Sequence, residues 1–447
     1  MSTQELFAGK LSYYRDAILY RDVKVILTAD ALIWQVDHIE QYLSLDDVVG
    51  VSLKESREAS GDRVFYLIIN AYPLQKSKFI KQSRRILKEY WFVCLDMVTR
   101  AKWQQAINNT LQGQAIDAPP QPRRLQILIN PNSGKQKAWQ IFELVRPLLT
   151  RSNLEFMVTE TFSGEDTKHK VREMDLSTVD GLVVVGGDGT IHDAIAGLMS
   201  RQDGDRAIQT PIGVIPGGTG NGLCKSLLEI SQETYDPLHA AFLIAKGKQK
   251  PCDIAVISQN NRKFYSFLSL AWGLIGDVDI ESQKLGFLGS LRFDLYSLLL
   301  ICLLRTYKGR FSFKPAPNWQ LPPHIRHTVK QDGEWWILED EFIFLWAMNT
   351  AWAAHDMNVT PYAEIDDGVM DVLIMRQPTS RMELLKALLR CGKGEHLSLP
   401  HMEYYQVCSF RLEPLSDRGT LVVDGEAIDY SPIQLDIMPG LATVNCK

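Results

Sequence analysis

The stretch Val183–Thr190, Val-Val-Val-Gly-Gly-Asp-Gly-Thr, restricts the folds open to this chain more than any other. Its β-branched residues predict a buried strand, and its glycines allow a sharp turn and a close approach of ligand to backbone. An apolar helical face follows, made by Ile191, Ala194, Ile195 and Leu198. Asp188 is therefore expected in a strand-to-helix turn beside helix N-terminal amides, where α/β folds bind ligands. For this motif alone, a tight turn with an aspartate N-cap is an equally good interpretation.

Two further turns of this kind follow other predicted strands. The strand at 125–129 runs into Asn-Pro-Asn-Ser-Gly-Lys at 130–135, and the strand at 212–215 runs into Pro-Gly-Gly-Thr-Gly-Asn-Gly at 216–222. Glycine leaves backbone amides uncovered, which suits a nest for phosphate oxygens. Because such turns share one edge of a parallel sheet, the three together predict a polyphosphate site. The P-loop pattern and the Rossmann glycine fingerprint do not occur at these turns.

The 447 residues are enough for two or three domains. Residues 1–114 are predicted to form a small β-rich domain that ends in a helix at 97–111 and resembles a pleckstrin-homology-like barrel. The prolines of 115–124 predict a linker. Strands alternate with helices over 125–250, which predicts an α/β domain with a parallel sheet and helices on both faces. Residues 251–447 are richer in strands and predict a β-sandwich.

Three further segments carry specific predictions. Residues 264–270 are predicted to form one strand. Residues 288–304 are predicted to form a helix, either a core helix or one that lines an apolar substrate site or faces a membrane. A basic cluster between two N-terminal strands either meets an anionic lipid surface or forms a solvated loop. Its members are Lys76, Lys78, Lys81, Arg84, Arg85 and Lys88.

Composition and terminal sequence limit the expected classes of binding partner and the expected cellular compartment. The net charge of −5 gives no global basic field, so no nucleic acid partner is expected. The seven cysteines include no Cys-x-x-Cys pair, which fits a reducing compartment. The first ten residues lack the apolar core of a signal peptide, and the longest apolar run, at 298–304, is too short to span a bilayer. We expect a cytoplasmic protein with peripheral membrane association.

The glycine-rich turns together resemble the lipid kinase family that includes diacylglycerol kinases and sphingosine kinases. The segment Ser269–Ser282, with its Asp-Val-Asp run, and Val-Asp-Gly-Glu at 423–426 are similar to sphingosine kinases in particular. The resemblance covers about residues 123–447. It implies that the chain uses ATP and Mg²⁺ to phosphorylate the primary hydroxyl of a sphingoid base, and that the C-terminal domain binds the lipid. A diacylglycerol or ceramide kinase and a catalytically silent lipid-binding adaptor are the alternatives.

The resemblance also implies a role for each matching residue. Asp188 would be the catalytic aspartate that takes the proton of the lipid hydroxyl. Ser269, Asp277 and Asp279 would bind the substrate, and Asp279 would pair with its amine. The metal ligands stay open, although two acidic residues, Asp424 and Glu426, would act near the nucleotide or its Mg²⁺. The implied nucleotide-binding residues are Asn130, Ser133, Gly134, Thr161 (with Thr159 as a rival), Gly187, Gly189, Gly217, Gly218, Thr219, Gly220, Asn221, Arg292, Asp424 and Glu426.

Overall fold

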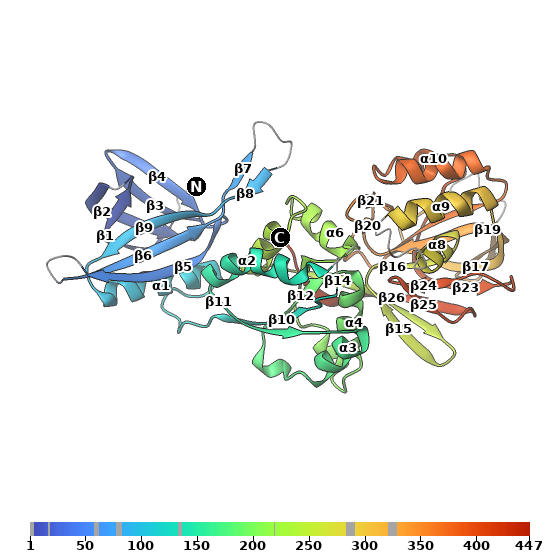
Figure 1. Cartoon of the computed structure of the whole chain (residues 1–447), viewed down its shortest axis with the longest axis horizontal. Helices are drawn as coiled ribbons and strands as arrows, with labels where there is room; N and C mark the ends of the chain where they lie inside the picture. Colours follow the sequence, from blue (N-terminus) through green and yellow to red (C-terminus); the bar gives the residue numbers. More distant parts are fainter. Residues whose placement is uncertain are drawn as a thin grey trace.

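The computed structural model arranges the chain as three parts in a row along its longest axis (Figure 1). A β-rich N-terminal part is followed by a central α/β part and by a C-terminal part made mostly of strands. The structure describes residues 4–16, 18–57, 62–76, 83–132, 136–218, 220–282, 291–320 and 329–447, and for residues 291–294 it describes the backbone only.

The N-terminal part is a seven-stranded antiparallel sheet followed by helix α1 (Met97–Leu111), which has the predicted bounds. The strand order is β4-β3-β2-β1-β9-β6-β5. These strands are β1 (Glu5–Arg15), β2 (Ile18–Thr28), β3 (Ala31–Val36), β4 (Ile39–Ser44), β5 (Val48–Arg57), β6 (Arg63–Ala71) and β9 (Lys88–Cys94). Trp34, Phe92 and Trp103 of α1 are fully buried between sheet and helix. Two short strands, β7 (Leu74–Lys76) and β8 (Ser83–Arg85), pair separately as a ribbon.

The central part contains the predicted parallel sheet, in the order β11-β10-β12-β13. Its strands are β10 (Arg123–Ile129), β11 (Leu154–Glu160), β12 (Gly181–Gly186) and β13 (Ile212–Pro216). Its helices are α2 (Ala138–Arg151), α3 (Gly164–Glu173), α4 (Asp188–Met199), α5 (Gly204–Ala207), α6 (Gly222–Ile230) and α7 (Pro237–Lys246). Separate apolar cores bury one face of the sheet against α2 and α7 and the other against α3, α4 and α6. Helices therefore cover both faces, as predicted.

The C-terminal part is built from antiparallel strands around an aromatic core that includes Trp272, Phe311 and Tyr405. The longer strands are β14 (Gln249–Gln259), β17 (Tyr307–Pro315), β19 (Trp335–Met348), β22 (Met370–Arg376), β23 (Glu403–Pro414) and β26 (Ile433–Asn445). The shorter ones are β15 (Arg262–Ser266), β16 (Ser269–Gly273), β18 (Lys330–Asp332), β20 (Trp352–Ala354), β21 (Met357–Asn358), β24 (Leu421–Val423) and β25 (Glu426–Ile428). The helices are α8 (Leu274–Glu281), α9 (Leu291–Leu303) and α10 (Arg381–Cys391). Because β26 pairs with β13, one continuous sheet joins the central and C-terminal parts.

Two sequence-based predictions need revision in this part. The single strand expected at 264–270 is wrong, since β15 ends at Ser266, a turn occupies residues 267–268, and β16 begins at Ser269. Helix α9 is not simply a core helix. Leu300 and Ile301 are buried, but four leucines are between 44% and 52% exposed, namely Leu295, Leu298, Leu299 and Leu303. None of the helices that the structure describes is both long enough and apolar enough to cross a bilayer.

Candidate active site

The glycine-rich turns after β12 and β13 touch each other at the carboxyl edge of the parallel sheet. The Gly217 N–H donates to the Gly186 carbonyl at 2.8 Å, and the Asp188 N–H donates to the Gly220 carbonyl at 3.1 Å. A Cβ atom at Gly218 would lie 2.3 Å from the Cα of Gly187, so this approach requires glycine. The two turns therefore pack directly against each other.

The Asp188 side chain is buried beside these turns and is held by helix α6. Its Oδ2 accepts the Gly222 N–H at 2.7 Å, and its Oδ1 accepts the Leu223 N–H at 3.3 Å. Both donors belong to the first turn of α6. In α4 itself, Gly187 is the N-cap and Asp188 is the first helical residue. The aspartate N-cap interpretation is therefore wrong, and the predicted helix N-terminal amides come from α6.

The environment of Asp188 changes its acidity. Burial raises the pKa of Asp188 to about 7, although the two α6 N–H groups lower it, and the negative charge of Asp424 adds to the increase. A carboxyl group with a pKa near the working pH can both accept and release a proton. Asp188 is therefore suited to act as a general base.

Asp424 lies inside a network of protein donors. Its carboxylate accepts five hydrogen bonds, from Ser266 Oγ (2.6 Å), Ser269 N (2.9 Å), His192 Nδ1 (3.0 Å), Leu268 N (3.2 Å) and Phe267 N (3.3 Å). Its own N–H donates to the Ser269 carbonyl at 2.9 Å. Asp424 thus fixes the turn between β15 and β16 and connects it to α4. These contacts favour a positioning role over the predicted contact with nucleotide or Mg²⁺, whereas Glu426 in the same turn is exposed.

His192 was not predicted from the sequence, and its hydrogen bond to Asp424 connects α4, the helix that begins at Asp188, to this network. It lies four residues after Asp188, on the same face of α4, which is a spacing that the sequence does contain. Burial lowers the pKa of His192, but the hydrogen bond and charge of Asp424 raise it further, so that the net change is upward. The hydrogen bond between His192 and Asp424 therefore joins the central part, which carries Asp188, to the C-terminal part, which carries Ser269.

Two of the predicted nucleotide-binding residues, Asn130 and Thr161, directly follow the neighbouring strands β10 and β11 at the same edge of the sheet. Asn130 follows the last residue of β10, and its Oδ1 accepts the Asn132 N–H at 3.0 Å. Thr161 donates its N–H to the Ile129 carbonyl at 2.8 Å, and its buried hydroxyl has no hydrogen-bonding partner among the described residues. The rival Thr159 accepts a hydrogen bond from Gln126 instead. Ser133, Gly134, Thr219 and the side chain of Arg292 lie outside the described residues.

Gly189 and Asn221 complete this edge of the sheet. No described atom lies within 4 Å of a Cβ placed on Gly189, so the first turn is open there. Asn221 is the N-cap residue of α6, and its Nδ2 donates to the Gly218 carbonyl at 2.7 Å. The Asn221 side chain therefore closes the second glycine turn on itself.

Ser269 and the two aspartates of α8 have different surroundings. Ser269 begins β16 and is half-buried, next to Asp424. Asp277 is buried and accepts hydrogen bonds from Tyr307 (2.6 Å), Thr420 (2.9 Å) and Arg305 (3.1 Å). Asp279 is half-buried, and two residues along a helix correspond to a rotation of about 200°, so it faces away from Asp277. The structure therefore engages Asp277 in protein contacts, with Arg305 and Tyr307 as partners that the sequence did not reveal.

Comparisons with known proteins agree with this arrangement. Residues 124–257 match the diacylglycerol kinase catalytic domain, and residues 323–446 match the YegS C-terminal NAD kinase beta sandwich-like domain. A putative diacylglycerol kinase from Bacillus anthracis str. Sterne has the same fold, with a TM-score of 0.55 and 21% identity over 74% of this chain and 97% of that one.

Sphingosine kinases are similar to this chain over most of its length. Sphingosine kinase 1 of Arabidopsis thaliana is 34% identical over 72% of this chain and 75% of its own. Sphingosine kinase 1 of Homo sapiens is 33% identical over 72% of this chain and 90% of its own. With the touching glycine turns and the buried Asp188, these similarities establish that the chain belongs to the sphingosine kinase family and is an ATP-dependent lipid kinase.

Proposed function

We propose that this kinase transfers the γ-phosphate of ATP to the primary hydroxyl of a sphingoid base and so produces a long-chain-base 1-phosphate. The observation that carries this proposal is the Asp188 carboxyl, which is buried beside two touching glycine turns and has a pKa near neutrality. The sphingosine kinases named above support the acceptor class.

In the proposed mechanism the chain positions both reactants. Amides of the glycine turns hold the phosphates, which fits the open space at Gly189. The Asp188 carboxylate accepts the proton of the lipid hydroxyl as that oxygen approaches the γ-phosphorus. Ser269 contacts the hydroxyl end of the lipid, and Asp279 pairs with its protonated amine.

Magnesium is expected beside the phosphates. It is commonly held by one or two carboxylates, waters and the phosphates themselves, not by an all-protein cage. Among the described residues, no group of three or more His, Cys, Asp or Glu side chains is arranged to hold a metal. The exposed Glu426 carboxylate fits such a sparse site better than the fully engaged Asp424. Bound Mg²⁺ would neutralise charge on the phosphates.

A direct assay tests the proposed reaction. The full chain is incubated with radiolabelled ATP and, separately, sphingosine, phytosphingosine, ceramide and diacylglycerol, and the products are identified by thin-layer chromatography. Label is expected in the 1-phosphate of the sphingoid bases. Transfer only to ceramide or diacylglycerol would assign a different acceptor, and no transfer to any lipid would support the silent adaptor.

Asp279→Asn is expected to weaken the use of sphingoid bases selectively. A carboxylate that faces an apolar lipid is costly unless a cation pairs with it, and the amine of the base supplies that cation. The variant should raise the KM for sphingosine about tenfold or more, the range of a charged hydrogen bond, with little change in the KM for ATP. Steady-state kinetics measure both constants. An equal loss with ATP and lipid would contradict amine pairing.

We also propose peripheral membrane contact through α9, whose four exposed leucines form an apolar surface. Replacing Leu298 and Leu299 with serine should reduce binding of the chain to lipid vesicles. Sedimentation with vesicles measures this binding, and activity on detergent-solubilised sphingosine should change little. Unchanged sedimentation of the double variant would place the contact elsewhere.

The seven antiparallel strands followed by α1 support a pleckstrin-homology-like fold for the N-terminal part, as a separate proposal.

A further inference from the structure

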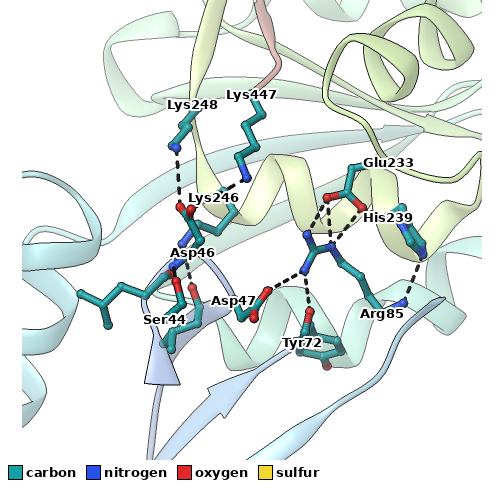
Figure 2. Close-up of polar contacts among 12 residues, drawn as sticks. Ser44, Asp46, Asp47, Tyr72, Arg85, Glu233, His239, Lys246, Lys248 and Lys447 are labelled. Atoms are coloured by element: carbon teal, nitrogen blue, oxygen red, sulfur yellow. Dashed lines mark hydrogen bonds and ion pairs between the residues drawn. The ribbon is translucent and has the colours of Figure 1, made fainter. Parts of the chain in front are cut away.

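Arg85, at the end of the β7–β8 ribbon, joins the N-terminal part to the central part through a buried guanidinium (Figure 2). It forms an ion pair with Glu233 at 2.5 Å and another with Asp47 at 3.1 Å, and it donates to the Tyr72 carbonyl at 2.6 Å. The face of the guanidinium lies 3.6 Å from the centre of the Phe242 ring. Arg85 is therefore an interior residue, so neither the lipid-facing nor the solvated interpretation of the basic cluster is right for it. Lys78 and Lys81 of that cluster lie outside the described residues.

The neighbouring His239 makes a further hydrogen bond to Glu233, the main partner of Arg85. The backbone N–H of Arg85 donates to His239 Nε2 at 3.2 Å, and His239 Nδ1 lies 2.7 Å from Glu233 (Figure 2). Since Nε2 accepts, the proton sits on Nδ1 and is donated to Glu233. Burial raises the pKa of Glu233, but His239 and Arg85 lower it further, so that the net change is downward. Glu233 is thus a fixed carboxylate with donors on both sides.

The rest of the boundary between the two parts is also closely packed. Val49 and Tyr72 of the N-terminal part belong to the same apolar core as α2 and α7. Lys246, at the end of α7, donates to the carbonyls of Leu45 (2.7 Å) and Val48 (2.9 Å). A Cβ on Gly50 would lie 2.7 Å from the carbonyl oxygen of Arg151. The N-terminal part is therefore packed against the central part and not merely tethered to it.

Arg85 contacts the residues that follow α6, and these are connected to the active site in two ways. Glu233 follows the end of α6, whose first turn donates the two N–H groups to Asp188. Tyr235 lies two residues after Glu233. Burial raises the pKa of its hydroxyl, and the side chain of Asn221, the residue that closes the second glycine turn, opposes that increase. Both the start and the end of α6 are thereby tied to residues around the phosphate-binding turn.

We propose that Arg85 is a positioning residue for phosphoryl transfer, through which the N-terminal part holds α6 and the turn at 217–222 in register with Asp188. The proposal deepens the function proposed above and rests on Asp188 as the base. The match to the diacylglycerol kinase catalytic domain begins at residue 124, so it assigns no role to the N-terminal part.

The test uses Arg85→Met in the full chain, which keeps the aliphatic contact with Phe242 and removes the charge. Arg100→Met is a matched control, because Arg100 is also buried, pairs with Glu55 at 2.8 Å and lies over the Phe65 ring, all within the N-terminal part. Tyr235→Phe is a milder second variant, since it removes only the hydroxyl that contacts Asn221.

Three readouts separate positioning from a general loss of stability. Arg85→Met should lower kcat about 10- to 100-fold, the range that displacement of a catalytic group produces. It should also increase amide hydrogen exchange at 217–228 and weaken binding of a non-hydrolysable ATP analogue, whereas Arg100→Met should do neither. Tyr235→Phe should lower kcat less, and the Arg85→Met/Tyr235→Phe double variant should fall short of the product of the two effects.

The pH profile provides a fourth readout. Looser α6 amides would stabilise the Asp188 carboxylate less, so the acidic limb of kcat should move to higher pH in Arg85→Met. The other ionisable groups that interact with Asp188 are Asp424 from the β24–β25 turn, Cys224 from α6 and Tyr235.

These results can be separated from an error in the proposed lipid substrate. The exchange and nucleotide-binding readouts need no lipid, and the kinetics can use whichever lipid the wild type phosphorylates. Equal kinetic changes in Arg85→Met and Arg100→Met would overturn the proposal, because they would show a general effect of N-terminal instability. If Arg85→Met does not fold, wild-type kcat and exchange in Tyr235→Phe would overturn it.

Discussion

Asp188→Asn is expected to lower kcat by about 10²–10⁴-fold, the usual contribution of a positioned general base, while the chain keeps its fold. The amide has the shape of the carboxylate and keeps an oxygen for the Gly222 N–H, the shorter of the two α6 contacts, but it does not accept the proton of the lipid hydroxyl. Because burial raises the pKa of Asp188 to about 7, the buried charge costs the folded state free energy, and a neutral amide removes that cost. Transfer of radiolabel to lipid and thermal unfolding measure the two properties.

The pH dependence of kcat gives an independent check on Asp188. The carboxyl acts as a base only when it is ionised, so wild-type kcat should rise with pH through about 7 and then level off. In Asp188→Asn this limb should disappear, leaving a low rate that depends little on pH in this range. Near-normal kcat in the variant, or the same limb at a lower rate, would show that another group accepts the proton.

The candidate site was predictable from the sequence where local pattern and sheet topology agree. Glycine-rich turns that follow parallel strands must meet at one edge of the sheet, so the contact between the turns at 186–190 and 216–222 follows from strand order alone. The position of the α6 amides does not follow in this way. It depends on how the second turn folds back over the first, which the close approach of Gly187 and Gly218 permits.

The sequence was least informative where a distant side chain decides the local structure. Residues 264–270 have the composition of one strand, but the Asp424 carboxylate takes three consecutive N–H groups at 267–269 and imposes a turn. Since Asp424 is more than 150 positions away, no local pattern contains this information. The same is true of Arg85, whose partner Glu233 lies 148 positions along the chain. In both places a buried charge, not a propensity, determines the backbone path.

Asp424→Ala is expected to have the largest effect on stability, about 3–5 kcal/mol, which is typical of removing one member of a buried charged network. The variant leaves the N–H groups of residues 267–269, the Ser266 hydroxyl and the His192 ring without their acceptor. Unfolding by denaturant, followed by circular dichroism, measures the change in the free energy of unfolding. Hydrogen exchange at 266–270 should rise most.

The matched control is Glu426→Ala, two residues away in the same turn and exposed. A surface substitution of this kind should change stability by less than about 0.5 kcal/mol, so that any loss it causes should appear as a higher requirement for Mg²⁺ or ATP. Asp424→Ala should instead lower the stability of the chain and change its requirement for Mg²⁺ or ATP little, because the Asp424 carboxylate accepts its hydrogen bonds from protein donors. The turn that this carboxylate fixes carries Ser269. If Asp424→Ala instead unfolds like the wild type and only raises the Mg²⁺ requirement, its carboxylate acts on the nucleotide, as the family resemblance implied.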